Sequence, residues 1–399
     1  MPLRIFYASA GRANLIRSHE YWAKGEENPD EVALTFSGQV EEAATRLGAA
    51  LLMVSDRADG GRLEDGAIRI EHLVRPKDAS GLGFYINGLR YALTLVRRAR
   101  RFRADIALVD TGVMPFFMLS LFRLAGIKVV PILHNTLWAE GFRPTGKLAR
   151  LVMALDRLFW RRGPAFVLAV SSAIERQLRC TAGAVAYPIR PIRAQFVRDY
   201  FASITPPIRL ADEPFQMMFV GRLVREKGVF DIVDMARLIE RDHPGLVRWT
   251  LCGGGPDLEA VRESVAAAGL TAAVDVRGRV EPADLRRLYP RIHACIVPTR
   301  SSFPEGLAMT AVEDVLERRP VVTNKVVPAL ELVRSAAMEA EPDNAASHAQ
   351  AVIALATDEA LYARLQAATL TEGEAFYDRA QGLAAVLEQS LGEISRPRR

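Results

Sequence analysis

The hydrophobic positions of the chain form short apolar runs that alternate with longer stretches of helical periodicity. In the first half, helical patterns such as 85–101 separate five candidate strands: 3–8, 50–54, 106–109, 127–133 and 166–170. Unbroken apolar runs of roughly four to eight residues are typical of strands that are buried on both faces. Strands that alternate with helices predict a parallel sheet covered by helices on both sides.

The second half repeats this alternation and adds a glycine-containing turn after each strand. The turns are 221–228 after strand 216–220, 253–257 after strand 250–252, and 278–280 after strand 274–277. Ligands of open α/β sheets bind outside the carboxyl ends of the strands, so these turns predict a binding edge. Glycine lets the backbone approach a planar or charged ligand, although chain reversal explains a glycine turn equally well.

The first of these turns carries two cations, Arg222 and Lys227. An arginine offers a planar fork for two phosphate oxygens and a lysine a compact point charge, so together they can neutralise a leaving diphosphate. A solvated turn is the alternative for the two residues taken alone. The chain has no Asp-x-Asp, His-x-x-x-His or paired-cysteine motif, so we expect neither a metal nor another cofactor.

A second candidate segment places two carboxylates, Glu305 and Glu313, eight positions apart across a loop-to-helix junction. Pro304 and Gly306 favour a turn, and good helix formers fill 308–316, so the free N–H groups of the first turn predict a phosphate site. Either carboxylate can accept hydrogen bonds from vicinal hydroxyls of a sugar or a ribose. A solvated helix that carries two acids is the alternative for this segment alone.

Together these motifs resemble a known family. The order Gly221-Arg222-x4-Lys227, Gly253-Gly254-Gly255-Pro256, Gly278-Arg279-Val280 and Glu305-x7-Glu313 resembles the nucleotide-binding half of family-4 retaining glycosyltransferases, the glycosyl transferases group 1. The resemblance covers about residues 214–335. It implies the α/β GT-B fold, in which two Rossmann-like domains face a central cleft and clasp a nucleoside diphosphate sugar.

The resemblance also implies roles for single residues. Arg222 and Lys227 would hold the diphosphate, Glu305 the transferred sugar, Glu313 the ribose, and the backbone of Arg279 and Val280 the base. Geometry and resemblance together give an expected donor-binding set of Gly11, Gly221, Arg222, Lys227, Gly254, Arg279, Val280, Glu305, Gly306, Leu307, Ala308 and Glu313. The expected catalytic set is Arg222, Lys227, Glu305 and His134.

His134 follows strand 127–133 and resembles the family's active-site histidine, which faces the sugar from the acceptor domain. A histidine hydrogen-bonded in a loop is the alternative, but ligand sites favour the carboxyl ends of strands. Ala308 departs from the family, which often has glycine or proline there; we expect it to be tolerated because alanine is small and favours helices.

The sequence predicts a domain junction over 191–214, where prolines at 206, 207 and 214 break the periodicity. We expect an acceptor-side domain over 1–205, a nucleotide-sugar-binding domain over 206–375, and a final helical segment over 376–399 that crosses back to the first domain, as in the resembling family.

Composition agrees with a globular protein: of 399 residues, 50% are hydrophobic and 25% charged. The three cysteines are widely spaced and no apolar leader precedes Leu3, which indicates a reducing cytoplasm without structural disulfides. No uninterrupted apolar run reaches the roughly 20 residues of a membrane-spanning helix.

Charge is shared unevenly. Residues 1–205 carry 29 Lys and Arg against 19 Asp and Glu, a net +10, whereas the remainder carries −5 of the total +5. Segment 147–162 is a basic amphipathic helix, which can lie on an anionic membrane surface, where each cation contributes about 1 kcal/mol. A solvated, core-packing helix is the alternative. The membrane hypothesis suggests a lipid-linked acceptor and a peripheral enzyme.

The sequence therefore predicts a retaining, metal-independent hexosyltransferase that moves a sugar from a UDP- or GDP-sugar to a glycan, lipid-linked or small-molecule acceptor. Two alternatives are a sugar-nucleotide epimerase of the same fold and a non-catalytic nucleotide-sugar-binding protein. The isoelectric point near 9.2 suggests nucleic acid, but the basic excess is confined to one half and lacks a recognised binding motif, so no nucleic-acid partner is expected.

Overall fold

The computed structural model describes residues 2–11, 13–26, 28, 31–75, 80–207 and 213–395. The chain divides into two compact units. The first, here the N-terminal domain, comprises Met1–Leu137, Pro144–Phe196 and Asp378–Arg399, and the second, the C-terminal domain, comprises Trp138–Arg143 and Val197–Tyr377.

Within the described residues, the N-terminal domain contains an eight-stranded sheet in the order β3-β4-β2-β1-β5-β6-β7-β8. The strands are β1 Arg4–Ser9, β2 Ala50–Ser55, β3 Gly61–Asp65, β4 Ile68–His72, β5 Ile106–Asp110, β6 Lys128–Leu133, β7 Val167–Ala169 and β8 Ile189–Pro191. They pair in parallel, apart from the antiparallel hairpin of β3 and β4. The sequence did not predict this edge hairpin, because β3 is largely exposed and polar and gives no apolar run.

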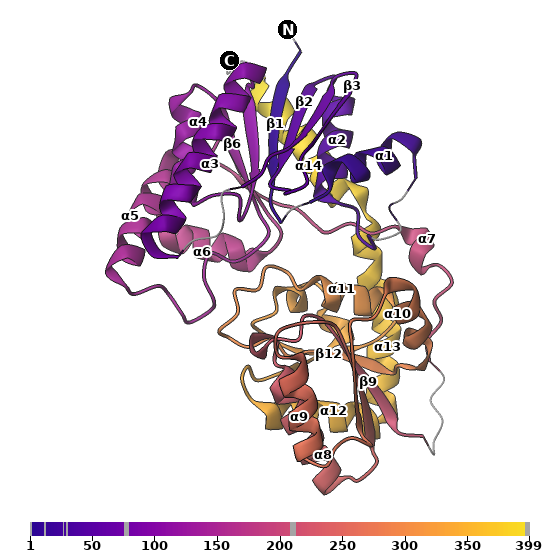
Figure 1. The fold of residues 1–399 in the computed structure, drawn as a ribbon. Coiled ribbons are helices and arrows are strands. Elements are labelled where there is room, and N and C mark those ends of the chain that lie inside the picture. The colour runs from indigo at the N-terminus through magenta and orange to yellow at the C-terminus, as the bar shows by residue number, and fades with distance from the viewer. Residues whose placement is uncertain are drawn as a thin grey trace. The chain divides into compact units, whose positions relative to one another are not determined.

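The C-terminal segment of the chain belongs to the N-terminal domain, where helix α14 (Leu383–Ser395, yellow in Figure 1) packs against α2 (Phe36–Arg46). The Gln39 side chain accepts a hydrogen bond of 2.9 Å from the backbone N–H of Leu383. Leu383, Leu387 and Leu391 are fully buried, so this helix completes the core of the domain. The other helices of the domain are α1 Leu15–Lys24, α3 Gly81–Phe102, η1 Phe116–Leu119, α4 Ser120–Leu124, α5 Lys147–Arg162, α6 Ser172–Ala182 and η7 Arg379–Gln381.

The described part of the C-terminal domain contains a six-stranded parallel sheet in the order β11-β10-β9-β12-β13-β14. The strands are β9 Phe215–Val220, β10 Val247–Cys252, β11 Val274–Gly278, β12 Ala294–Val297, β13 Val321–Asn324 and β14 Ala337–Ala340. The helices are α7 Arg198–Phe201, η2 Arg225–Lys227, α8 Val229–Asp242, α9 Leu258–Ala267, α10 Pro282–Leu288, η3 Tyr289–Arg291, α11 Met309–Leu316, η4 Pro328–Glu331, η5 Arg334–Ala336, α12 Ala345–Thr357, α13 Glu359–Glu374 and η6 Ala375–Tyr377.

This strand order is that of the dinucleotide-binding fold, and it reverses direction between β9 and β12. The N-terminal sheet reverses in the same way between β1 and β5. Such a reversal is where open α/β sheets place their ligands, so each domain has one expected binding edge.

Strand β9 explains why its sequence reads as an unbroken apolar run. Phe215, Met217 and Phe219 pack into a core cluster with residues of α8 and α12, whereas Met218 packs into a second cluster with Tyr289. Because successive side chains of a strand point to opposite faces, both faces of β9 are buried.

The structure also bears on the expectations about membrane-spanning helices and about the cysteines. Among the described residues, no helix is both long enough and apolar enough to cross a bilayer. Cys180, Cys252 and Cys295 are all free thiols, and the last two are buried.

We predict that Leu387→Ala destabilises the N-terminal domain by about 2–5 kcal/mol, because it opens a cavity under a fully buried side chain. Hydrogen exchange should become faster in α2 and α14 and stay unchanged in α8. Leu370→Ala, at a position that is 52% exposed in α13, is the matched control and should cost less than about 0.5 kcal/mol. Faster exchange in α8 alone would contradict the assignment of the last helix.

Candidate functional site

Three loops at the carboxyl edge of the C-terminal sheet are tied together by backbone hydrogen bonds. Leu223 N–H donates to the Gly254 carbonyl at 2.9 Å, and Gly253 N–H donates to the Gly278 carbonyl at 2.7 Å. The first bond joins the loops after β9 and β10, and the second joins the loop after β10 to the last residue of β11, where the third loop begins. The edge that the sequence predicts as a binding site is therefore one connected backbone surface.

Two glycines in these loops are required by other backbone atoms. A Cβ at Gly253 would lie 1.7 Å from the Gly221 carbonyl oxygen, and one at Gly255 would lie 2.1 Å from that of Leu223. At Gly254 the nearest atom to such a Cβ is the Arg279 Cβ, at 3.9 Å. Only Gly254 of the three has the open side on which a ligand could approach, so chain packing explains the other two.

An ion pair joins the two loops that flank the reversal of the C-terminal sheet. Lys227 Nζ, from the loop after β9, contacts Glu305 Oε2, from the loop after β12. The same Glu305 oxygen accepts a hydrogen bond of 3.2 Å from Thr299 Oγ1. The Lys227 and Glu305 side chains are only 18% and 9% exposed, so solvent screens their attraction weakly.

The Phe303 ring lies beneath both candidate phosphate-binding cations. Lys227 Nζ is 4.3 Å from the ring centroid and Arg222 Cζ is 5.9 Å from it, which are cation–π distances. Arg222 is exposed, and among the described residues it has no carboxylate within ion-pair distance. The group formed by Arg222, Lys227 and Glu305 therefore keeps one uncompensated positive charge, which attracts an anion.

Helix α11 begins one residue later than the sequence suggests. Ala308 precedes the helix and has a φ of +67°, in the left-handed region, where a Cβ costs about 1–2 kcal/mol. Helix propensity therefore does not bear on Ala308, because the residue lies outside the helix in a backbone conformation that favours glycine; that alanine is tolerated there stays a prediction. Gly306 and Leu307 are buried beside it, and no side chain caps the first turn, so its N–H groups stay open to an anion.

Burial changes the acidity of the carboxyl groups on α11. Desolvation raises the pKa of Glu313 to about 7 and that of Asp314 to about 8. Tyr289 Oη donates a hydrogen bond of 2.9 Å to Asp314 Oδ1. Glu313 is therefore partly protonated near neutral pH and can both donate to and accept from a hydroxyl group.

The residues expected near the base differ in how firmly they are held. The Arg279 side chain is 82% exposed, and its Nε lies 3.3 Å from Glu281 Oε1. Val280 is partly buried against the cluster that contains Met218 and Cys252. Packing thus fixes the backbone at Val280, which is the part expected to contact a base.

His134 lies at the carboxyl end of β6 in the N-terminal domain and takes part in a polar chain. Its Nε2 is 3.0 Å from Asp110 Oδ1, and the other Asp110 oxygen accepts a hydrogen bond of 2.7 Å from Tyr7 Oη. The backbone N–H of His134 donates to Thr111 Oγ1 at 3.2 Å, and its ring packs on Phe36 with centroids 4.4 Å apart. His134 Nδ1 is buried without a hydrogen-bond partner, so in this conformation it is not presented to a ligand.

Gly11 lies two residues beyond the end of β1, at the same edge of the sheet, and its neighbour Arg12 is outside the described residues. An added Cβ at Gly11 would meet no atom within 4 Å. This edge is open at Gly11, as the expected approach of a phosphate requires.

The structure brings Arg222, Lys227 and Glu305 together in one domain, while His134 and Gly11 belong to the other. Sequence reasoning missed the groups that hold them: Phe303 and Thr299 around the ion pair, and Asp110 and Tyr7 beside His134. Asp110 had a usable signal, because it ends a buried strand that neighbours the strand before His134.

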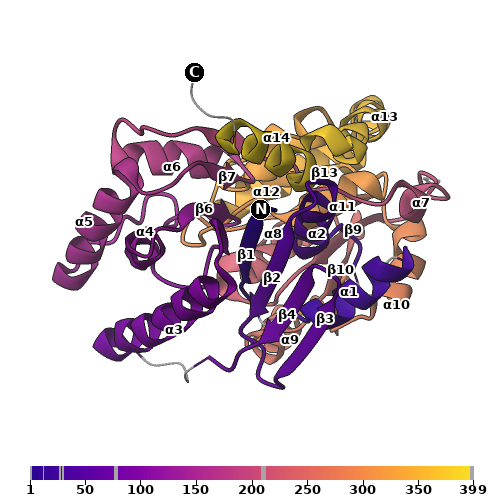
Figure 2. The ribbon, with the colours of Figure 1, turned by 90° about the horizontal axis from the view of Figure 1, so that it is seen from above.

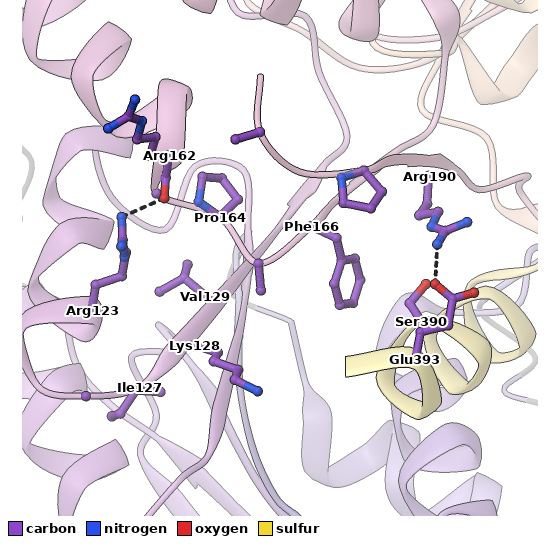
Figure 3. Close-up of a pocket in the computed structure, with 15 residues that line it drawn as sticks. Arg123, Ile127, Lys128, Val129, Arg162, Pro164, Phe166, Arg190, Ser390 and Glu393 are labelled. Carbon is purple, nitrogen blue, oxygen red and sulfur yellow. Dashed lines mark hydrogen bonds and ion pairs between the residues drawn. The ribbon is translucent and has the colours of Figure 1, made fainter. Parts of the chain in front are cut away.

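A pocket of about 600 Å³ lies at the other edge of the N-terminal sheet (Figure 3). Lys128 at the start of β6 and Arg190 in β8 line it. Arg190 pairs with Glu393, and Arg123 donates a hydrogen bond of 2.7 Å to the Arg162 carbonyl. Its position at the amino ends of the strands separates it from the predicted binding edge.

Among the described residues, no group of three or more His, Cys, Asp or Glu side chains is placed to hold a metal ion. The charged groups that the sequence predicts at the reversal of the C-terminal sheet are Arg222, Lys227 and Glu305.

Family models match both halves of the chain. A glycosyl transferase 4-like domain matches residues 34–194, and the model described as glycosyl transferases group 1 matches residues 202–370. The chain belongs to the glycosyl transferases group 1. The two matches together cover this group 1 glycosyl transferase except for residues 1–33, 195–201 and 371–399.

Known proteins similar to this group 1 glycosyl transferase include a glycogen synthase of Mycobacterium tuberculosis, 24% identical over 233 residues, which are 57% of this chain and 53% of that protein. The chain thus spans about half the length of the curated relative that it matches. A sucrose-phosphate synthase from Thermosynechococcus elongatus matches with a TM-score of 0.70 at 16% identity. The match covers 98% of this chain and 98% of that chain. Alr3699/HepE of Anabaena, in complex with UDP, has a TM-score of 0.65 at 16% identity, and covers 99% of this chain and 100% of that one. These likenesses confirm the GT-B fold, with its two Rossmann-like α/β domains.

We predict that Gly253→Ala and Gly255→Ala each destabilise the C-terminal domain by about 2 kcal/mol or more, because the new methyl group meets a carbonyl oxygen. Gly254→Ala is the matched control and should change the free energy of unfolding by less than about 0.5 kcal/mol. Urea titration of the three variants measures this. Equal losses at all three positions would show that loop packing does not distinguish them.

We predict that Asp314→Asn changes how stability depends on pH. The folded state keeps the Asp314 proton up to a pKa of about 8, whereas the unfolded state releases it near its ordinary pKa, so this group's contribution falls as the pH rises between these values. Asparagine can still accept the Tyr289 hydrogen bond. The variant should therefore gain stability relative to the parent, by on the order of 4 kcal/mol between about pH 5 and pH 8.

The exposed Asp284→Asn is the control for this titration, because its carboxylate is 60% exposed. Denaturant unfolding at several pH values supplies the comparison. If the difference between Asp314→Asn and the parent stays constant over that range, Asp314 does not retain its proton.

Proposed function

We propose that this protein is a retaining glycosyltransferase that moves a hexosyl group from a UDP- or GDP-sugar to an acceptor. One observation carries the proposal: the Lys227–Glu305 ion pair lies at the reversal of the C-terminal sheet, with the uncompensated Arg222 beside it on Phe303. Open α/β sheets bind nucleotides at such a reversal, and the local excess of positive charge suits a diphosphate.

The donor diphosphate would occupy the space between Arg222, Lys227 and the start of α11. Arg222 can offer two parallel N–H groups to two phosphate oxygens, and Lys227 can add a third contact as a point charge. The first-turn N–H groups of α11 point their partial positive charge in the same direction along the helix axis. Both cations are positioned by the Phe303 ring, which limits the side-chain entropy lost on binding.

Chemistry at this site follows from charge. When the bond between the sugar and the diphosphate breaks, the leaving group gains negative charge, and Arg222 and Lys227 stabilise it before any reorganisation of water is needed. As Lys227 turns toward phosphate, Glu305 keeps its hydrogen bond from Thr299 and becomes a free acceptor for hydroxyl groups of the transferred sugar. Two cations supply the neutralisation that a divalent metal would otherwise provide, so the proposed reaction does not need one.

Retention of the anomeric configuration rests on the family resemblance, which implies same-face attack with the diphosphate helping to deprotonate the acceptor. Glu313 is proposed to bind the ribose, and the backbone at Val280 the base. The UDP in the Anabaena structure supports a uridine nucleotide, and GDP is the second candidate.

His134 is proposed to contact the transferred sugar from the acceptor domain. The Asp110 carboxylate lies 3.0 Å from its Nε2, and Tyr7 holds Asp110 in turn. Because Nδ1 is buried, contact with a hydroxyl group requires the ring to rotate or the sugar to approach its exposed edge.

The acceptor is a glycan, a lipid-linked sugar or a small molecule, and polysaccharide or glycolipid synthesis is the matching process. A sugar-nucleotide epimerase of the same fold is the second candidate; it would release free nucleoside diphosphate without an added acceptor. A non-catalytic binding protein would be stabilised by the donor but never consume it.

We predict that Lys227→Ala lowers turnover by about 100- to 1000-fold, because it removes a cation that meets developing charge. Lys325→Ala, at an exposed lysine of the same domain, should leave turnover unchanged. Donor binding is measured first, by thermal shift with a panel of UDP- and GDP-sugars, since a ligand at about 100 times its dissociation constant adds about 2.7 kcal/mol of stability. Release of the nucleoside diphosphate with the preferred donor then gives turnover.

Near-normal turnover of Lys227→Ala would remove this residue from the catalytic set. Turnover that disappears in excess chelator and returns with a divalent metal would show that the two cations are insufficient. Stabilisation by the donor without its consumption, over a panel of acceptors, would favour the non-catalytic alternative.

A further inference from the structure

Exposed apolar side chains of this protein concentrate on two helices of the N-terminal domain, α3 and α5. Of the 12 large hydrophobic residues that are substantially exposed among those described, eight lie on these helices. They are Leu82 (67% exposed), Phe84 (43%), Ile86 (44%) and Leu89 (43%) on α3, and Leu148 (43%), Leu151 (58%), Leu155 (39%) and Leu158 (72%) on α5. Single exposed leucines need no explanation, but such clustering marks an interaction site.

The two helices form one surface. Figures 1 and 2 show α3 and α5 on the same side of the N-terminal sheet, with α4. Their first turns line a common hollow of about 510 Å³, to which α3 contributes Phe84 and Tyr85 and α5 contributes Lys147 and Leu148. The short helix η1 lies between them and packs on both through Tyr85–Phe117 and Phe116–Trp160 ring contacts.

Helix α5 packs on the core through its carboxyl end, but its leucines face solvent. Its buried side consists of Phe159 and Trp160, which are 3% and 0% exposed. Leu151, Leu155 and Leu158 follow at a spacing of four and then three residues, so they lie close together around the helix, and all three face solvent. The core takes up the aromatic pair at the carboxyl end of α5, so the exposed leucines are available to another partner.

The charge of this surface is of one sign. Helix α3 has five arginines and no acidic residue over its 22 positions. Helix α5 has five cations and one acid, Asp156, whose Oδ1 accepts a hydrogen bond of 2.8 Å from the Phe117 N–H and so faces inward. Arg150 and Arg157 are exposed, and among the described residues they have no carboxylate within ion-pair distance.

The leucines and the free arginines of α5 lie side by side around the helix. At about 100° per residue, Arg150 and Arg157 point roughly 100° away from the leucines, in the direction away from Phe159. A flat surface that is apolar inside and anionic outside matches this arrangement, because the leucines can enter it while the arginines stay at its charged layer. A protein partner would need a matching acidic rim, and the acidic half of this chain is one such candidate.

We propose that the surface formed by α3 and α5 docks this protein on an anionic lipid bilayer, with its leucine and phenylalanine side chains at the acyl boundary and its arginines among the headgroup phosphates. The donor site in the C-terminal domain takes no part in this contact, so the proposal stands independently of the proposed activity. Docking of the acceptor-side domain would favour a lipid-linked acceptor over a free one.

The test is flotation of the full chain with vesicles of phosphatidylcholine alone and with about one third phosphatidylglycerol. The parent should bind the anionic vesicles at least about 30-fold more tightly than the neutral ones and lose binding in high salt. Arg150→Gln/Arg157→Gln should weaken anionic binding roughly 30-fold, at about fivefold or more per cation. Leu151→Gln/Leu155→Gln should weaken it by about tenfold or more.

Matched controls come from the C-terminal domain. Leu370→Gln changes a leucine that is 52% exposed on α13, and Arg287→Gln changes an arginine whose side chain is 79% exposed. Both should bind like the parent. Thermal unfolding shows whether each variant is folded, and the thermal shift with the nucleotide sugar shows whether the donor site is intact, so failure of the docking surface and failure of the proposed activity are read separately.

Insertion has its own signature. Lipids brominated along the acyl chain should quench the tryptophan fluorescence that Leu155→Trp adds to that of the parent. They should not quench the fluorescence that Leu370→Trp adds. Absence of binding, equal binding to neutral and anionic vesicles, or equal loss in the control variants would overturn the proposal. So would a concentration-dependent dimer, measured by sedimentation without lipid, that the α5 leucine variants alone dissociate, because the surface would then be a protein interface.

Discussion

The ion pair between Lys227 and Glu305 is the interaction on which the geometry of the C-terminal binding edge depends. It joins the loops after β9 and β12 where the strand order reverses, the one place at which neighbouring loops leave the sheet in opposite directions. Because Glu305 is almost buried, removing Lys227 also leaves a carboxylate without its cation, which is costly in weakly screened surroundings. The Thr299 hydrogen bond lowers that cost, since it retains one partner for Glu305 while the lysine contacts another anion. The ion pair thus links the two loops, and its lysine can still turn to another anion.

In the N-terminal domain, a different set of side chains links the strands at the reversal of the sheet. Tyr7 on β1 and Asp110 at the end of β5 bridge the reversal of that sheet, and Asp110 continues to His134 after β6. Burial raises the pKa of the Tyr7 hydroxyl well above its usual value, so it stays a hydrogen-bond donor to Asp110. In each domain, hydrogen-bonded or ion-paired side chains therefore span the reversal of the strand order. Without them, the carboxyl edge of a parallel sheet presents only backbone groups at that point. A rigid sheet gives these side chains fixed positions.

Much of the fold could be predicted from the sequence because local signals were strong. The predicted helix 147–162 matches α5 in its bounds, and buried strands such as 216–220 match within a residue. The β3–β4 hairpin was missed because its residues lack an apolar run, and the left-handed Ala308 was missed because helix propensity does not report on the residue before a helix. The partners Phe303, Thr299 and Asp110 could not be predicted individually: their contacts depend on which strands are neighbours, and strand order is a property of the whole sheet.

The leucines of α5 show why burial cannot be deduced from periodicity. An amphipathic pattern states that one side of a helix avoids water, but the same pattern fits a helix packed on a core and a helix laid on a bilayer. Which apolar side chains of α5 are buried depends on which of them reach the core of the domain. Phe159 and Trp160, held by the Phe116 ring at 4.8 Å from Trp160, fill the space that the domain offers to α5. Leu155 and Phe159 are four residues apart and so neighbours on the helix surface, yet only Phe159, in the last turn, meets the core, and the leucines are left facing outward.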